Sequence, residues 1–253
     1  MTLTDNPRGA YLFLPGISPY SCGVVAAPGY EIVHVTLGRP LPWRSGFEAV
    51  ADHLGRLGRP RQALCAVELR SPAPFTLKGF IEFNRGYREV LKEWDLMVDG
   101  VNPVARTNVA PEVGPPQEPA LHAFSCTVPS GEQGWRPTFV VAGAGEVREG
   151  RLDIASIVRE GETSVDAMRE KAAYVVGCMS ERLGGLGVGW EDVTAVGVYT
   201  VHDIHPLLGS PLLSAAHGAA RHGLTWRFAR PPIVGIEFEM DARGVREERV
   251  IQA

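Results

Sequence analysis

The chain has 253 residues, which is enough for one large domain or for two small domains that each bury a core. Hydrophobic residues make up 45% and charged residues 21%, and the net charge of -4 comes without any run of lysine or arginine. This composition is typical of a globular protein that needs no nucleic-acid partner and no membrane, since no stretch approaches the roughly 20 apolar residues of a membrane helix.

The first half of the chain alternates between predicted strands and helices. Residues 46–57 and 75–94 carry apolar side chains at helical spacing, whereas the other segments are short, apolar and rich in β-branched residues. The predicted strands of this half are 30–36, 63–72, 104–111 and 119–128. The order is therefore strand, helix, strand, helix, strand, strand.

After a turn-rich break at 129–137, the same order repeats in the second half. The predicted helices are 163–187, capped by Thr163 or Ser164 and ended by glycines, and 207–223, which Pro211 interrupts. The predicted strands are 138–145, 192–201, 224–232 and 233–241. The halves share pattern more than identity, as in a diverged tandem repeat.

The repeated order predicts an α/β (α+β) protein with two units, residues 1–129 and 130–253. In each unit two helices cover one face of a mostly antiparallel sheet. The other face is still partly apolar, so a sheet from the other half or from another chain must bury it. We therefore expect tight pairing of the two halves, or a homo-oligomer.

One arginine stands out because it lies in an apolar strand. Arg106 lies between Val104 and Val109, with Thr107 and Asn108 beside it. Such an arginine either reaches solvent at a strand edge or binds an anion, because its planar guanidinium can grip a carboxylate with two hydrogen bonds. The residues alone leave both interpretations open.

Two glutamates in the last predicted strand form a second candidate group. Glu237 and Glu239 alternate with Ile236 and Phe238, so the pattern predicts that both carboxylates point to one face. A carboxylate in a cleft can position and deprotonate water, whereas the same pattern on a solvated face has no catalytic meaning. Tyr20 follows a proline turn and is either a packed aromatic or a hydrogen-bond donor to a substrate.

Four segments together resemble the RidA family, also called YjgF or UK114. They are SPYSCGVV (18–25), VARTNV (104–109), GVGWEDVTAVGVYTVHD (187–203) and ARPPIVGIEFEMD (229–241). No single segment is specific, but their order and spacing are similar to those of the family. The resemblance covers nearly the whole chain, twice.

The resemblance implies two tandem chorismate-mutase-like units. Single-domain relatives form trimers with clefts between subunits, so a trimer is the expected assembly. Relatives hydrolyse enamines and imines of amino acids to keto acids and ammonia, some act on aminomuconates in aromatic catabolism, and a distant branch cleaves chorismate. The resemblance implies no cofactor and no metal, and a small carboxylate-bearing substrate as partner.

The resemblance also assigns roles to individual residues. Arg106 matches the family's carboxylate-binding arginine in the first half only, since Gly223 or Leu224 stands there in the second half. Glu237 matches the family's terminal-strand glutamate in the second half only, since Ala120 and His122 stand there in the first. This complementary loss suggests one composite cleft.

In the predicted cleft Glu237 activates water and Tyr20 orients the substrate as catalytic residues, while Arg106 grips a carboxylate. Backbone N–H groups near Thr107 and Asn108 could contribute to substrate binding, and Glu239 is included because it shares the predicted strand face.

Other polar residues suggest weaker alternatives. The pair His202 and His205 lacks a complete metal-binding motif, and His122 could line a second cleft. Cys22 lies close to Tyr20 in sequence, but nothing places a histidine beside it to make a nucleophile. All of these favour structural or surface roles.

The cysteines and the first residues indicate the compartment. The chain contains four cysteines without CxxC or metal-ligand spacing, Cys22, Cys65, Cys126 and Cys178. Such scattered cysteines are typical of reduced thiols, and residues 1–16 lack the pattern of a signal peptide, so we expect a cytoplasmic protein.

Three functions remain open at this level. The first is a cofactor-independent hydrolytic deaminase of a carboxylate-bearing enamine or imine, with a 2-aminomuconate-type substrate as the specific hypothesis. The second is cleavage of a chorismate-like enol ether. The third is a non-catalytic protein that binds small carboxylates or a partner protein.

Overall fold

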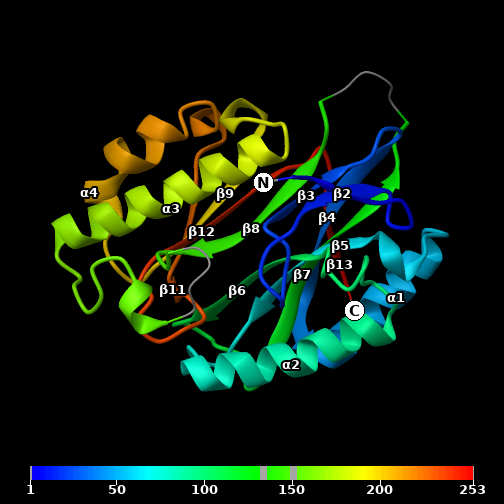
Figure 1. Cartoon of the computed structure of the whole chain (residues 1–253), viewed down its shortest axis with the longest axis horizontal. Coiled ribbons are helices and arrows are strands. Elements are labelled where there is room, and N and C mark those ends of the chain that lie inside the picture. The colour runs from blue at the N-terminus through cyan, green and yellow to red at the C-terminus, as the bar shows by residue number, and fades with distance from the viewer. Residues whose placement is uncertain (1, 132–135, 149–152, 253) are drawn as a thin grey trace.

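The computed structural model describes residues 2–131, 136–148 and 153–252. Two β-sheets pack face to face in the centre and helices cover their outer faces, so the chain forms four layers (Figure 1). The expected mixed class, with helices on one face of each mostly antiparallel sheet, is confirmed. In the described part of the chain, no helix has both the length and the apolar character needed to cross a membrane.

The first sheet has the strand order β11-β6-β5-β7-β4-β13. Its strands are β4 (Tyr30–Pro42), β5 (Leu64–Arg70), β6 (Ala105–Pro111), β7 (Ala120–Pro129), β11 (Ala229–Arg230) and β13 (Glu248–Ile251). Its outer face is covered by α1 (Trp43–Arg56) and α2 (Leu77–Glu93), with a 3-10 turn, η1, at Arg61–Ala63 (Figure 1). Thr76 begins α2 because its hydroxyl accepts the N–H of Gly79 at 3.1 Å.

The second sheet has the strand order β1-β2-β3-β8-β12-β9-β10. Its strands are β1 (Thr4–Asn6), β2 (Tyr11–Leu14), β3 (Gly23–Ala26), β8 (Phe139–Gly145), β9 (Ala195–Tyr199), β10 (Thr225–Arg227) and β12 (Glu239–Gly244). The long helix α3 (Val165–Gly185) and the short α4 (His205–Leu207) cover its outer face (Figure 1). Ser164 caps α3 by accepting the N–H of Ala167.

The facing sides of the two sheets bury each other. Tyr11, Phe13 and Val24 of the second sheet share one apolar cluster with Ile32 and Ala105 of the first. The partner that the open sheet face requires is therefore the other half of the same chain. Trimer formation, which was expected on other grounds, stays a prediction.

The sheets exchange strands across the middle of the chain. Strands β1 to β3 come from the first 26 residues but lie in the sheet of the second half, whereas β11 and β13 lie in the sheet of the first half. The division into units 1–129 and 130–253 stays a prediction about the repeat. Positions 132–135 of the turn-rich break at 129–137 lie outside the described residues.

The helix expected over 207–223, with its interruption at Pro211, is confirmed only as far as residue 215, and the prediction is wrong for residues 216–223. The region consists of α4, a kinked π-helix, η4, over Leu208–Leu213, and a 3-10 turn, η5, over Ala220–His222. Pro211 lies inside η4 and cannot supply a helical N–H, which explains the interruption. Two further 3-10 turns are η2 (Ile154–Ser156) and η3 (Trp190–Asp192).

The prediction of a strand beginning at residue 233 is also wrong, because β12 begins only at Glu239. Residues 233–236 form a turn in which Ile236 donates to the carbonyl of Ile233, and Gly235 has a φ of 93°. The backbone N–H groups of Glu237 and Phe238 donate to the side chain of Glu146. These two residues therefore lead into the strand without belonging to it.

Candidate active site

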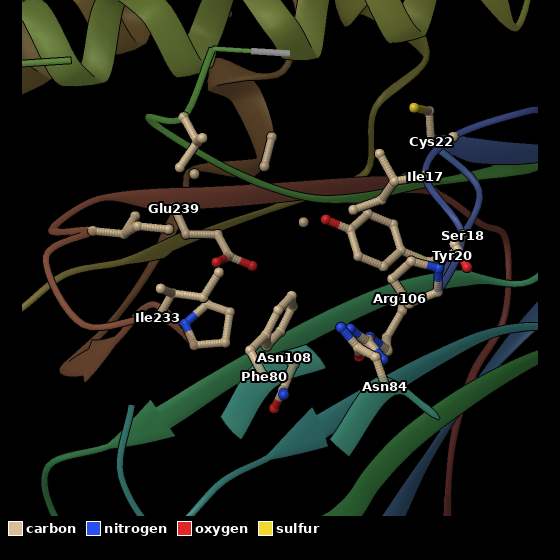
Figure 2. Close-up of a pocket in the computed structure, with 18 of the residues that line it drawn as sticks. Ile17, Ser18, Tyr20, Cys22, Phe80, Asn84, Arg106, Asn108, Ile233 and Glu239 are labelled. Atoms are coloured by element: carbon tan, nitrogen blue, oxygen red, sulfur yellow. The ribbon is translucent and has the colours of Figure 1, made fainter. Parts of the chain in front are cut away.

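A cavity of about 630 Å³ opens between the two halves of the chain. Residues from the loop before β3, from α2 and β6, and from β8, α3 and the start of β12 line it. The cavity therefore combines side chains from both sheets, and its volume is in the range of small-molecule sites. Of the residues selected from the sequence, it brings together Tyr20, Arg106, Asn108 and Glu239 (Figure 2).

Arg106 is a buried cation with unused hydrogen-bond donors. Its side chain projects from β6, and the residue is only 3% exposed. Neither Nη1 nor Nη2 has a hydrogen-bond partner among the described residues. Burial lowers the pKa of the guanidinium, so the environment disfavours its charge. Donors in this state favour the binding of an anion.

Aromatic rings hold this guanidinium in place. Its central carbon lies 4.8 Å from the ring centre of Tyr87 and 5.0 Å from that of Tyr20. Phe80 and Phe83 follow at 5.6 and 6.0 Å. Three of these rings come from α2, where spacings of three and four residues put them on one face. Ring faces attract the cation without using its N–H donors, which leaves those donors for a ligand.

The loop that carries Tyr20 is fixed to the entrance of β6. Ser21 donates its backbone N–H to the carbonyl of Val104 at 3.0 Å, and its hydroxyl donates to the carbonyl of Pro103. The side chain of Asn102 donates to the carbonyl of Pro19 at 2.7 Å. Burial raises the pKa of Tyr20, so the phenol keeps its proton and can donate it in a hydrogen bond.

Glu239 supplies the carboxyl group of the cavity. It is 4% exposed and is the first residue of β12. Burial raises its pKa well above the ordinary value, and the nearby carboxyl groups of Asp241 and Glu146 act in the same direction, against the opposing charges of Arg106 and Arg182. Glu239 is therefore a carboxylic acid that keeps its proton where an exposed glutamate has lost it.

Gly143 makes room for this carboxyl group. A Cβ atom at position 143 would lie 2.2 Å from Oε1 of Glu239 and 3.3 Å from the Cα of Thr107. No side chain fits there without displacing Glu239. Glycine at this position is thus a requirement of the site.

Two asparagines add polar groups at the same place. Asn108 accepts from the hydroxyl of Ser71 at 3.0 Å, which leaves its Nδ2 without a partner among the described residues. Asn84, four residues after Phe80 on α2, has a buried Oδ1 that likewise lacks a partner there. Sequence reasoning missed Asn84, although its helical spacing from Phe80 could have indicated that it shares the face toward β6.

The cavity is strongly cationic. Besides Arg106, four further arginines line it, Arg85, Arg88, Arg148 and Arg182. Arg182 donates to the backbone carbonyls of Ala142 and Gly143, which ties α3 to β8. Glu239 is the only acidic residue among the described lining residues. This charge balance favours an anionic ligand, and no local pattern indicates that Arg85, Arg88 and Arg182 of the helices share a cavity with Arg106.

Two of the predicted site residues lie elsewhere. Glu237 does not line the cavity, and its carboxylate lies 2.9 Å from Nε2 of His202 and 3.7 Å from Arg230. Thr107 does not line it either, because its hydroxyl donates to Asp241 at 2.8 Å. The expectation that Glu237 and Glu239 share a strand face fails because the strand begins at Glu239.

The weaker alternatives gain no support from their positions. In the described part of the chain, no group of three or more His, Cys, Asp or Glu residues could hold a metal ion. Cys22 lines the cavity, but none of the described lining residues is a histidine that could activate it. His122 lies outside the cavity, and burial lowers its pKa to about 4.

Comparisons with known proteins give a consistent result. The sequence model of a family described as 2-aminomuconate deaminase CnbZ matches residues 3–249. A 2-amino-5-chloromuconate deaminase from Comamonas testosteroni is 43% identical over 244 residues, which cover 96% of this chain and 96% of that protein. The expected likeness to aminomuconate deaminases is thereby confirmed.

Similar solved structures include a chorismate-cleaving protein and a YjgF protein, the two kinds of relative expected from the sequence. A chorismatase is 15% identical and aligns over 88% of this chain and 77% of its own, with a TM-score of 0.44. The YjgF gene product of E. coli is 17% identical and aligns over 46% of this chain and 84% of its own, with a TM-score of 0.27. These likenesses are too weak to carry an argument about function.

Proposed function

Because the chain belongs to the 2-aminomuconate deaminase CnbZ family, we propose that it is a deaminase that hydrolyses a dicarboxylate enamine or imine of the 2-aminomuconate type. The observation that carries this proposal is the pairing in one cavity of a buried guanidinium, whose Nη atoms have no hydrogen-bond partner among the described residues, and a buried carboxyl group whose pKa is raised. The first is suited to hold a carboxylate, and the second is suited to transfer protons.

Arg106 is the proposed clamp for the carboxylate next to the reacting carbon. Its Nη1 and Nη2 can donate two parallel hydrogen bonds to one carboxylate, and Nδ2 of Asn108 can add a third. Hydrogen bonds to a charged group in a buried site contribute about 1.5 to 3 kcal/mol each. The clamp therefore fixes the substrate with respect to Glu239 and Tyr20.

Glu239 is the proposed acid and base. Its neutral carboxyl donates a proton to the enamine carbon, and the nitrogen lone pair forms the C=N bond of an iminium ion. The carboxylate of Glu239 then takes a proton from water as the water oxygen adds to the C=N carbon and the π electrons return to nitrogen.

The same group completes the reaction. Glu239 returns its proton to the amine nitrogen, the C–N bond breaks with its electron pair on nitrogen, and the hydroxyl oxygen forms the C=O bond. The hydroxyl proton passes to Glu239, which is neutral again. One water is consumed, and one ammonia and one keto acid are formed, with no need for a cofactor. Tyr20 donates a hydrogen bond that orients the substrate.

Arg88 is the proposed partner of the second carboxylate. It follows Asn84 by four residues on α2, so the two side chains lie on the same side of the helix. It lines the cavity, and its Nε is buried without a partner among the described residues. A monocarboxylate leaves this cation unused, whereas a 2-aminomuconate-type dianion engages it.

A substrate panel with the wild-type protein tests the proposed function. We expect ammonia release from freshly generated 2-aminomuconate to be much faster than release from a 2-aminoacrylate-type imine, and to survive dialysis against a chelator. Release that requires added metal or cofactor would contradict cofactor independence. If neither substrate releases ammonia while 2-aminomuconate raises the melting temperature, the protein binds dicarboxylates without deaminating them.

A further inference from the structure

A second pair of charges lies behind the cavity and takes no part in the proposed reaction. Glu146 follows the end of β8, and Lys171 lies on α3; both side chains are 0% exposed. Nζ of Lys171 lies 3.2 Å from Oε1 of Glu146 and donates to the carbonyl of Val158 at 2.7 Å. A buried ion pair is weak evidence for stability, because desolvation of both charges opposes their attraction.

The hydrogen bonds of Glu146 point to a role in the site. Its Oε1 accepts the backbone N–H of Glu237 at 2.6 Å, and its Oε2 accepts that of Phe238 at 3.0 Å. These are the two residues directly before Glu239. In addition, Gly145 is the residue of β8 that pairs with Glu239. Glu146 therefore holds the backbone at the point where the chain delivers Glu239 to the cavity.

We propose that Glu146, itself held by Lys171, is a positioning residue that fixes both the place and the protonation of the Glu239 carboxyl. The inference rests on the proposed role of Glu239 as acid and base. Lys171 has its own part, since it keeps the Glu146 carboxylate oriented between α3 and the segment before β12.

The charged and titratable groups that face Glu239 determine whether its carboxyl keeps its proton. They are Asp241 on β12, Glu146 after β8, Arg106 on β6, Arg182 on α3 and Tyr20 in the loop before β3. The two carboxyl groups favour the neutral form of Glu239 and the arginines favour its ionised form. Removal of the Glu146 charge therefore makes Glu239 lose its proton at a lower pH.

The variant Glu146→Gln tests this proposal, with Glu170→Gln as its matched control. Glu170 is the neighbour of Lys171 on α3, but its carboxylate is exposed and pairs with Arg159. For Glu146→Gln we expect kcat to fall about 10- to 100-fold with KM changed less than about threefold. The basic limb of the kcat/KM profile should move about one pH unit lower. The control should leave both unchanged.

A double variant provides a second test in the event that Glu146→Gln does not fold. Glu146→Gln leaves Lys171 charged and unpaired in the interior, so Glu146→Gln/Lys171→Met removes both charges and keeps an apolar side chain in place of the lysine. The double variant should show the same displaced basic limb. If either folded variant keeps the wild-type limb and loses less than about threefold in kcat, the pair has only a structural role and the proposal is overturned.

An infrared titration separates this proposal from the proposed function. The difference spectrum between wild type and Glu239→Gln identifies the carbonyl band of the protonated Glu239, and its loss with rising pH requires no substrate. A band that disappears at lower pH in Glu146→Gln supports the positioning role even in a protein that releases no ammonia. An unchanged band in an active enzyme refutes it.

Discussion

Replacement of Arg106 by methionine should weaken catalysis and stabilise the fold at the same time. The guanidinium is buried, and its Nη atoms have no hydrogen-bond partner among the described residues, so the folded protein carries the cost of a desolvated charge. Burial also lowers the pKa of this guanidinium, because the interior disfavours its charged form. A methionine fills a similar volume among the rings of α2 without that cost.

The magnitude of each effect follows from the contacts. Two hydrogen bonds to a carboxylate contribute about 3 kcal/mol or more, so kcat/KM should fall at least about 100-fold. Against the removed desolvation, which costs several kcal/mol for a buried ion, stands the lost attraction to the rings, at about 2 kcal/mol for a well-placed ring in a desolvated site, and only the rings of Tyr87 and Tyr20 lie within 5.0 Å. The net free energy of unfolding should therefore stay equal or rise by about 1 to 2 kcal/mol.

The assay combines ammonia release with urea unfolding of wild type and Arg106→Met. Arg44→Met is the control, because Arg44 also lies over a ring, that of Trp43 at 4.6 Å, but is exposed and does not line the cavity. The control should lose neither activity nor more than about 1 kcal/mol of stability. An Arg106→Met protein that is less stable and retains kcat/KM within threefold would show that the arginine is a structural residue.

Three further variants extend the account. Arg88→Met should lower kcat/KM for 2-aminomuconate about 10-fold or more while a monocarboxylate imine is affected less than threefold, and equal losses on both would refute the second clamp. Glu239→Gln should stabilise the fold more at pH 8 than at pH 4. The pKa of Glu239 is raised in the folded protein, so above the pKa of the unfolded chain, near 4.3, the unfolded state gains stability by ionising this group. A stabilisation in urea unfolding that does not depend on pH would contradict this. Gly143→Ala should reduce kcat about 100-fold, since its Cβ would lie 2.2 Å from Oε1 of Glu239 and displace that carboxyl group. An unchanged kcat would show that catalysis does not depend on the exact position of the Glu239 carboxyl.

Much of the fold could be predicted from hydrophobic periodicity. Segment 75–94 carries helical spacing, segment 163–187 has a polar cap at Thr163 or Ser164 and glycines at its end, and both helices form within two residues of their expected ends. In the region 207–223 the interruption at Pro211 is found as predicted, but the helix does not continue beyond residue 215. The pattern does not indicate the strands β1 to β3, because each has only three or four residues and the group joins its sheet through the pairing of β3 with the distant β8.

In the site, too, some residues can be found from the local sequence and others only from contacts between distant segments. A cationic residue in an apolar strand made Arg106 conspicuous, and the structure places it in a buried cavity with Tyr20. The choice of Glu237 as the proton-transfer group depended on where the last strand begins. Before that start, the backbone N–H groups of Glu237 and Phe238 donate to Glu146, a residue 91 positions away from Glu237, so no local pattern could reveal it.

In the proposed reaction the carboxyl of Glu239, and not that of Glu237, transfers the protons of the deamination. The most direct measurement compares ammonia release from 2-aminomuconate by Glu239→Gln and Glu237→Gln, two identical chemical changes two residues apart. We predict that Glu239→Gln lowers kcat at least about 1,000-fold and that Glu237→Gln keeps it within about fivefold. The reverse order of effects, or full activity of Glu239→Gln, would contradict the account.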